Sequence, residues 1–283
     1  MSEEPASPEQ KEFGRNIRAV LEFKRHQDPG KDPETGMSAD FLTSKGREAA
    51  SSDGRKINEE TVKGYASPKL RAQETVDLML QNVDDGIRVI NKTTESLGAG
   101  AKHLIKKQRA SNEFNIRTRK ELDATANFGK VMPLASAWAE EQIKEGAKLD
   151  KYSLIVQWYL DNPDVCRENG VLTGQETAAE IAERVSVELG MTERLYSGSN
   201  VRLVNVTHGP KIEPFLQAVI NFKEIEEIGG ALQPGESLQF KVDINENRQK
   251  EVKLLFRNQE YTVDEGLIKM LAQKYRERLA EKA

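Results

Sequence analysis

Apolar and polar residues alternate along the chain with two different periods, and these predict strands that alternate with helices. Residues 17–23 (IRAVLEF) and 200–209 (NVRLVNVTHG) are short, rich in β-branched side chains and poor in charge, which is typical of buried strands. Residues 63–67 predict a third, shorter strand. After each of these segments, apolar residues recur at helical spacing.

The predicted helices lie between these strands and beyond the last of them. One helix is expected to begin near Ser38 or Thr43, and another follows Pro68, because proline fits the first helical turn without losing a hydrogen bond. Further helical segments are residues 135–148, 152–162, 177–196 and 211–228. Strands separated by helices indicate βαβ crossovers, so we predict an α/β fold of three αβα layers around a mostly parallel sheet.

The chain divides into a main domain and two flanking parts. Residues 1–14 are polar and are expected to be disordered, and residues 15–228 form the α/β domain. Within it, residues 95–113 predict a basic helical insertion between two extended segments, 86–94 and 114–122. Residues 229–283 predict a β-hairpin followed by a helix. This appendage could extend a sheet edge, cover the core or form a homodimer contact, and the sequence does not choose among these.

Composition narrows the classes of protein to which the chain can belong. Its 283 residues are 31% charged with a net charge of −4, so there is no overall basic signature for nucleic acid. The single cysteine, Cys166, excludes a disulfide framework, and no Cys/His cluster has zinc spacing. We therefore expect neither metal nor cofactor. No signal peptide and no apolar run long enough for a bilayer is visible, which predicts a cytoplasmic protein without a membrane partner.

Two of the three histidines follow predicted strands. His26 comes after the first strand and His208 ends the last one, while Arg25 adjoins His26 and Arg71 lies just beyond the strand at 63–67. Ligands of open α/β sheets bind at the carboxyl ends of the strands, so these four side chains are expected to meet in one crevice. Guanidinium groups match the oxygens of a phosphoryl group, and a neutral imidazole can attack phosphorus. The pattern favours phosphoryl transfer without a metal ion.

Several motifs that contain these residues resemble those of the histidine phosphatase superfamily, which has the phosphoglycerate-mutase-like fold. That superfamily carries an Arg-His-Gly box, a Leu-Thr helix start, a Ser-Pro-x-x-Arg-Ala segment and a late His-Gly after a hydrophobic strand. The matching residues here are Arg25-His26, Leu42 to Ala50, Ser67 to Thr75 and His208-Gly209, with residues 174–185 resembling a fifth motif. They occur in the same order and cover residues 17 to about 220.

The resemblance implies a role for each residue of the predicted crevice. His26 would be the nucleophile that becomes phosphohistidine, and Arg25, Arg71 and His208 would hold the phosphoryl oxygens. The implied activity is that of a metal-independent phosphatase acting on a small phosphorylated substrate. A phosphoglycerate mutase is the first alternative, although the longer box of those mutases is absent after His26. A phosphate-binding or regulatory module with weak catalysis is the second.

The sequence departs from the superfamily pattern most clearly at two places. Gln27 replaces the usual glycine after the nucleophile, and we predict that it binds substrate, as does Lys211 three residues after His208. The usual motif of the general acid has no clean counterpart. Glu121 is the first choice for this acid, and the alternatives are Asp123 and Glu95.

The basic insertion has two interpretations. Its cations could form a solvated helical face, or they could cap the site and bind a second anionic group of the substrate. The side chains concerned are those of Lys102, His103, Lys106, Lys107 and Arg109.

Overall fold

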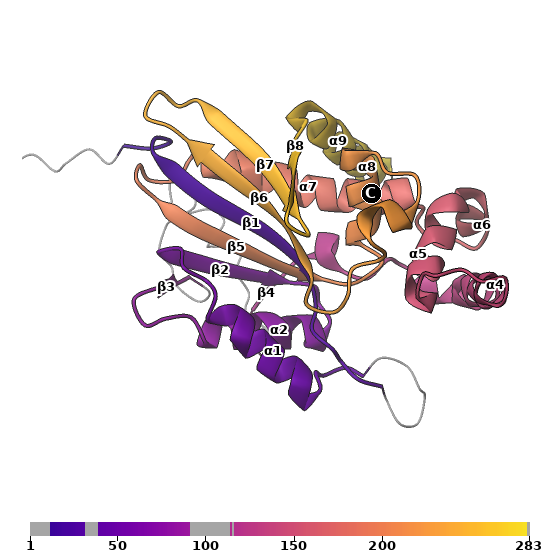
Figure 1. Cartoon of the computed structure of the whole chain (residues 1–283). Coiled ribbons are helices and arrows are strands. Elements are labelled where there is room, and N and C mark those ends of the chain that lie inside the picture. The colour runs from indigo at the N-terminus through magenta and orange to yellow at the C-terminus, as the bar shows by residue number, and fades with distance from the viewer. Residues whose placement is uncertain (1–11, 32–38, 91–113, 115, 282–283) are drawn as a thin grey trace, which may run out of the picture.

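The computed structural model describes residues 12–31, 39–90, 114 and 116–281 (Figure 1). The described strands form one eight-stranded sheet in the order β3-β2-β5-β1-β6-β7-β8, with β4 also paired to β2. Its parallel strands are β1 (Ile17–Arg25), β2 (Thr61–Ala66), β3 (Arg88–Val89), β4 (Arg117–Thr118) and β5 (Asn200–Thr207). The antiparallel strands are β6 (Ser237–Ile244), β7 (Lys250–Phe256) and β8 (Gln259–Thr262). The predicted α/β class is confirmed. The sheet is parallel from β3 to β1 and antiparallel from β1 to β8.

Helices cover both faces of this sheet, as predicted (Figure 1). On one face lie α1 (Ser44–Gly54) and α2 (Leu70–Gln81). The apolar residues of α2 pack on β2 and β5, and α1 packs against α2. On the other lie α7 (Gly174–Thr192), α8 (Ile212–Ile220) and α9 (Glu265–Glu281). This second face buries the larger core, which runs from β1 and β5 to β6 and β7.

A third group of helices packs beside the α7 and α8 layer. It contains α4 (Met132–Lys144), α5 (Lys151–Asp161) and α6 (Pro163–Glu168), which bury their own apolar cluster around Tyr159. Three short 3₁₀ helices connect the larger elements: η1 (Lys120–Leu122), η2 (Phe128–Lys130) and η3 (Ile225–Ile228). In the part of the chain that the structure describes, no helix combines the length and apolar character that crossing a membrane requires.

The ends of several helices follow from local side-chain chemistry. The Thr43 hydroxyl accepts a hydrogen bond from the Gly46 backbone N–H at 3.0 Å, so α1 begins at the later of its two predicted starts. The predicted helix 211–228 is interrupted, because Asn221 has a left-handed backbone with φ of 57° and separates α8 from η3. The predicted extended segment 114–122 is mostly irregular, with β4 and η1 as its regular parts.

The C-terminal hairpin extends the central sheet. Strand β6 pairs along the whole length of β1, with Leu21 opposite Phe240, and both side chains are fully buried in the larger core. Of the three roles left open by the sequence, this pairing shows that the hairpin extends the sheet and covers the core. A homodimer contact stays a prediction, and the predicted insertion at 95–113 lies outside the described residues.

Candidate active site

The register of the parallel strands brings both predicted histidines to one edge of the sheet. Arg25, the last residue of β1, pairs with Thr207, the last residue of β5. The backbone N–H of His26 then donates to the Thr207 carbonyl at 2.9 Å. The rings of His26 and His208 lie with centroids 4.9 Å apart and planes at 63°. The two imidazoles therefore lie together at the carboxyl ends of β1 and β5, where the sequence predicted them.

The hydrogen bonds of His26 define which of its nitrogens is free to react. Nδ1 lies 2.7 Å from the Gln27 carbonyl, and because a carbonyl can only accept, Nδ1 carries the proton. Nε2 accepts a hydrogen bond from Nε of Arg71 at 3.1 Å, so its lone pair faces the guanidinium. Burial, followed by the charges of Arg71 and Arg25, lowers the pKa of His26 to about 3 against the hydrogen bond to Gln27, which raises it. The imidazole is therefore neutral at physiological pH.

His208 is held by a serine that sequence analysis did not single out as a site residue. Its Nε2 lies 2.6 Å from the Ser67 hydroxyl, which also accepts from the Lys69 backbone N–H at 3.0 Å. His208 is only 2% exposed, and its Nδ1 is buried without a hydrogen bond to the residues that the structure describes. Burial keeps the pKa of His208 well below its usual value. The neighbouring His26 imidazole and the charge of Arg71 lower this pKa further.

Two guanidinium groups lie beside these imidazoles. Arg71, in the first turn of α2, is partly buried, and its Nη1 also reaches the carbonyl of Ala39 at 3.4 Å. Arg25 donates to the Leu232 carbonyl, and its Cζ lies 4.3 Å from the centroid of the Tyr152 ring. The charge of Arg25 acts on the pKa of both His26 and Arg71. The carboxyl ends of the strands thus combine neutral imidazoles with two cations whose geometry suits phosphoryl oxygens.

The side chain of Gln27 contacts another part of the protein. Its Nε2 donates to Oδ2 of Asp53 at 2.7 Å, and Asp53 also pairs with the buried Lys24 at 3.0 Å. The backbone N–H of Gln27 donates to the Thr75 hydroxyl at 3.2 Å. These bonds fix the carbonyl that orients His26. The contact between the Gln27 side chain and substrate stays a prediction, since its amide has a second N–H beside the one bonded to Asp53.

Lys211 is likewise engaged inside the protein. It is almost fully buried and forms an ion pair with Glu180 on α7. Glu180 also accepts from Nη2 of Arg278 at 2.8 Å, so one carboxylate joins two cations. The predicted contact between Lys211 and substrate stays a prediction, since an ammonium group has three N–H donors. The sequence could not reveal the ion pair, because Glu180 is 31 residues away and lies on another element.

The two described candidates for the general acid have different surroundings. Asp123 follows η1, and its charge acts on the pKa of Arg71 and of Lys211, both of which adjoin the crevice. Glu121 instead acts on the pKa of Arg119 and Arg184. The charge of Asp123 therefore acts on residues at the crevice, whereas the charge of Glu121 acts on residues at the face of the sheet covered by α7.

Two further carboxylates bear on the choice of acid. Asp40 is an exposed residue that sequence analysis did not consider. Burial lowers the pKa of Arg71, and the charge of Asp40 opposes this decrease. The third predicted candidate, Glu95, lies outside the described residues, as do the insertion cations. Of the described residues, Asp40 and Asp123 are thus the two carboxylates whose charges act on the pKa of Arg71.

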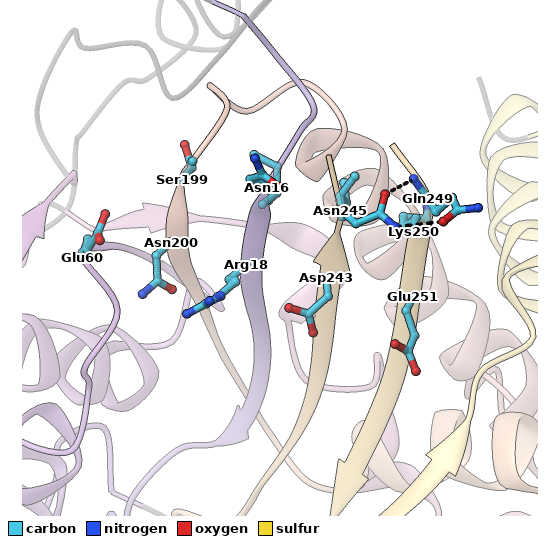
Figure 2. Close-up of a pocket in the computed structure, with 13 residues that line it drawn as sticks. Asn16, Arg18, Glu60, Ser199, Asn200, Asp243, Asn245, Gln249, Lys250 and Glu251 are labelled. Carbon is cyan, nitrogen blue, oxygen red and sulfur yellow. Dashed lines mark hydrogen bonds between the residues drawn. The ribbon is translucent and has the colours of Figure 1, made fainter. Parts of the chain in front are cut away.

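A large hollow of about 620 Å³ lies at the opposite edge of the sheet (Figure 2). It is lined by the first residues of β1 and β5 and by the tips of β6 and β7, including Arg18, Asn200 and Asp243 (Figure 2). Because β1 is nine residues long and rises about 3.3 Å per residue, this hollow lies roughly 25 Å from His26. It contains no histidine and takes no part in the site described above.

Within residues 12–31, 39–90, 114 and 116–281, no three His, Cys, Asp or Glu side chains lie together in a way that could hold a metal ion. The one cysteine, Cys166, is buried in the α4–α6 cluster, and burial raises the pKa of its thiol.

Comparisons with known proteins give structural matches only. No protein-family profile matches the chain, and no curated protein sequence does. The solved structures similar to it include a mycobacterial hydrolase, which is 15% identical with a TM-score of 0.47 over 86% of this chain and 99% of that one. They also include a mycobacterial glucosyl-3-phosphoglycerate phosphatase, 14% identical with a TM-score of 0.45 over 85% and 98% of the two chains.

A third similar structure is a protein histidine phosphatase with bound tungstate. It is 12% identical with a TM-score of 0.33, over 86% of this chain and 96% of that one. Likeness at this level does not define an activity, so the function proposed below is based on the geometry of the site.

The two neutral histidines predict a specific dependence of stability on pH. Their pKa values are lower in the folded protein than in the unfolded chain, so the unfolded chain binds more protons below about pH 6.5. Stability is therefore full above this pH and is lost as the pH falls toward 3. Between pH 7 and 5, the free energy of unfolding should decrease with a slope approaching about 1.4 kcal/mol per pH unit for each histidine. Urea unfolding at a series of pH values measures this slope.

The matched variant for this measurement is His26→Gln, which cannot titrate in this range. It should remove the share of the slope that His26 contributes and leave the share of His208. An unchanged slope in His26→Gln would show that His26 is protonated in the folded protein, contrary to its buried, neutral state.

Proposed function

We propose that this protein is a phosphatase of the histidine phosphatase superfamily, which hydrolyses phosphomonoesters without a metal ion through a phosphohistidine at His26. The observation that carries the proposal is the state of His26. Its Nδ1–H is fixed by the Gln27 carbonyl, its unprotonated Nε2 faces the crevice beside Arg71, and His208 lies against its ring. A neutral imidazole flanked by guanidinium groups is suited to attack an anionic phosphate ester.

In the first step, the phosphate group of the substrate replaces Nε2 of His26 as the partner of Arg71. The lone pair of Nε2 attacks phosphorus, the N–P bond forms, and the bond from phosphorus to the ester oxygen breaks. A carboxylic acid gives its proton to the departing oxygen, which leaves as an alcohol. The positive charge that develops on the imidazole is stabilised by the Nδ1–H bond to the Gln27 carbonyl.

In the second step, water attacks the phosphorus atom of phosphohistidine. The carboxylate formed in the first step accepts a proton from this water, the N–P bond breaks, and inorganic phosphate leaves. His26 returns to its neutral form with the lone pair on Nε2. No net proton or electron is gained by the enzyme over the two steps, and the acid is ready for another turnover.

Ser67 gives His208 a defined part in this reaction. We infer that the Ser67 hydroxyl, which accepts from the Lys69 N–H at 3.0 Å, donates its own proton to Nε2 of His208, 2.6 Å away. This leaves the proton of His208 on Nδ1, the buried nitrogen without a partner among the described residues. A phosphoryl oxygen would supply the missing acceptor, and we assign His208 to stabilising the charge that develops in the transition state.

The proposed activity can be tested with phosphomonoesters of different kinds. We expect release of inorganic phosphate from at least one member of a panel of phosphorylated sugars, nucleotides, glycolytic acids and phosphopeptides, with undiminished rates in the presence of a chelator. Transfer between phosphoglycerates faster than phosphate release would instead support a mutase. Failure to release phosphate from every member would contradict the proposal.

Asp123 is the carboxylate that we expect to protonate the leaving group. Asp123→Asn should lower kcat by about 10²- to 10⁴-fold for substrates with a poor alcohol leaving group, because such substrates need the proton in the transition state. The decrease should be much smaller for p-nitrophenyl phosphate, whose leaving group is stable as an anion. Steady-state kinetics with both substrates measure this difference.

The structure offers two matched controls for this variant. Glu121→Gln removes a carboxylate two residues away that contacts a different set of cations, and Asp40→Asn removes the other carboxylate acting on Arg71. Both should keep nearly the parental ratio of rates on the two substrates. If the leaving-group effect appears in Glu121→Gln or Asp40→Asn instead, the acid is that residue.

A further inference from the structure

Four cationic side chains gather around the buried ring of Tyr65, on the face of the sheet covered by α7. Nζ of Lys63 lies 5.7 Å, Cζ of Arg119 5.3 Å and Cζ of Arg184 3.9 Å from the ring centroid. Arg117 pairs in register with Tyr65 across β2 and β4. These residues, Lys63, Arg117, Arg119 and Arg184, form what we call the Tyr65 cationic cluster.

Within the part of the chain that the structure describes, one of the four cations has a close ionic partner. Arg184 pairs with Glu188, which is itself held by the Asn205 amide at 2.9 Å. The remaining three make no ion pair with any residue in the described ranges. Lys63 is only 6% exposed, and the buried Nε of Arg119 has no hydrogen-bond partner among the described atoms. Buried cations without partners are costly, so this arrangement requires an explanation.

The titration of the cluster agrees with an excess of positive charge. The pKa values of Lys63, Arg117 and Arg119 are all lowered, first by burial and in part by the neighbouring cations, and that of Arg119 falls to about 10. Burial alone would raise the pKa of Tyr65, yet its pKa is also lowered, because Arg184 and Lys63 favour the phenolate. The charge of Glu121 opposes the decrease in the pKa of Arg119 but does not reverse it.

We propose that the Tyr65 cationic cluster binds a phosphate-class oxyanion at a site separate from the His26 crevice. A doubly charged anion would compensate the unpaired cations, and the two arginines offer planar forks that match its oxygens. Lys63 adds a point charge from the buried side. Arg117 and Arg119 are only partly buried, so they give a ligand access from the edge of the sheet.

The cluster lies close to the proposed crevice without sharing its residues. Tyr65 lies in β2 and Ser67 directly follows the end of this strand, so the two residues are about 7 Å apart along an extended chain. Ser67 in turn contacts His208. An anion at the cluster could therefore be a second phosphate group of an elongated substrate, or a separate small anion. The shared chemistry is that of a phosphate-class oxyanion.

Sulfate is the probe for this site, because it resembles phosphate and is not hydrolysed. Calorimetric titration of the full chain should show two sulfate sites, one at the crevice and one at the cluster. The double variant Lys63→Gln, Arg119→Gln should lose the second site, with affinity reduced at least tenfold, and keep the first. Arg71→Ala should show the opposite pattern. Lys120→Gln, which removes an exposed neighbouring cation, should retain both sites.

One outcome overturns the proposal directly. The parent protein would bind sulfate at a single site, and the double variant would retain this site with unchanged affinity. If the double variant does not fold, Arg119→Gln alone serves the same comparison, and sulfate-induced stabilisation against heat replaces calorimetry. A sulfate shift in melting temperature equal in parent and Arg119→Gln would likewise contradict the site. Because sulfate binding is measured without turnover, failure of the proposed phosphatase activity would leave this test intact.

The source of the anion follows from kinetics on the folded double variant. A loss of kcat/KM confined to substrates with two phosphate groups, with p-nitrophenyl phosphate unaffected, would identify the second group of a substrate. Unchanged kcat/KM on both kinds of substrate, together with lost sulfate binding, would identify a separate anion. Either result supports the site and names the origin of its ligand.

Discussion

His26→Ala should abolish turnover, lowering kcat/KM by about 10⁴- to 10⁶-fold, as expected for loss of a nucleophile that acts as one unit with its neighbours. The physical reason lies in the state of this side chain. Its Nε2 is unprotonated and lies 3.1 Å from the Arg71 guanidinium, while its Nδ1–H is held by the Gln27 carbonyl. No other described imidazole has a free, oriented nitrogen in contact with Arg71. Phosphate release from the best substrate of the panel measures the effect.

The control for this variant is its folding. His26→Ala should unfold cooperatively in urea and keep the far-ultraviolet circular dichroism of the parent, because the sheet and its core do not depend on the imidazole. Retention of more than a hundredth of the parental kcat/KM by the folded variant would contradict the role of His26 as nucleophile.

Arg71→Ala should lower kcat/KM by about 10²- to 10³-fold, the usual cost of removing one donor to a charge that develops in the transition state. Arg71 enters the crevice from the first turn of α2 and contacts both the nucleophile and, in the proposed mechanism, the phosphoryl oxygens. Arg71→Lys keeps the charge but not the planar fork, so it should recover only part of the activity. Steady-state kinetics on one substrate compare the three proteins.

The same variant has a second, independent signature in the titration of His26. After burial, the charge of Arg71 is the largest of the effects that lower the pKa of His26. Its removal should raise that pKa, which nuclear magnetic resonance of the imidazole can follow. Arg47→Ala is the matched control. Arg47 is an exposed residue of α1 that pairs with Glu74 of α2 and does not contact His26. An unchanged pKa in Arg71→Ala would show that this contact is absent in solution.

The positions of the strand ends could be predicted because they depend on local pattern. The segments around 17–25 and 200–207 are apolar, β-branched and ended by turn residues, so their carboxyl ends, and with them His26 and His208, were predicted to meet. Pairing of β1 with β5 makes this meeting a consequence of parallel register. Sequence pattern therefore predicted the centre of the candidate site well.

The partners of the site residues could not be predicted, because they come from distant segments. Gln27 bonds to Asp53, 26 residues away, and the carbonyl that receives Arg25 belongs to Leu232, 207 residues away. No periodicity in the sequence relates such pairs. We predicted that Gln27 binds substrate from the identity of the residue alone. In the structure its side chain bonds to Asp53 of α1, and this contact depends on where α1 lies relative to β1.

The C-terminal segment shows the same limit. Its two main strands were predicted, but β8 was not, because the turn at Arg257 and Asn258 has no glycine although both residues have positive φ. Nor could sequence show which edge the hairpin joins. In the structure it lies beside β1, and the Gly235 N–H donates to the Arg25 carbonyl at 3.1 Å. The segment from residue 229 onward thus supports the loop that carries the nucleophile.

Detection of a phosphorylated His26 tests the central claim most directly. Rapid acid-free quenching of the enzyme with a phosphomonoester, followed by intact mass spectrometry and peptide mapping, should show one phosphoryl group on His26, with the acid lability of an N–P bond. The label should appear before the first turnover is complete and should be absent from His26→Ala. Turnover of the parent protein without any phosphoryl group on His26, or an equal label in His26→Ala, would contradict the account.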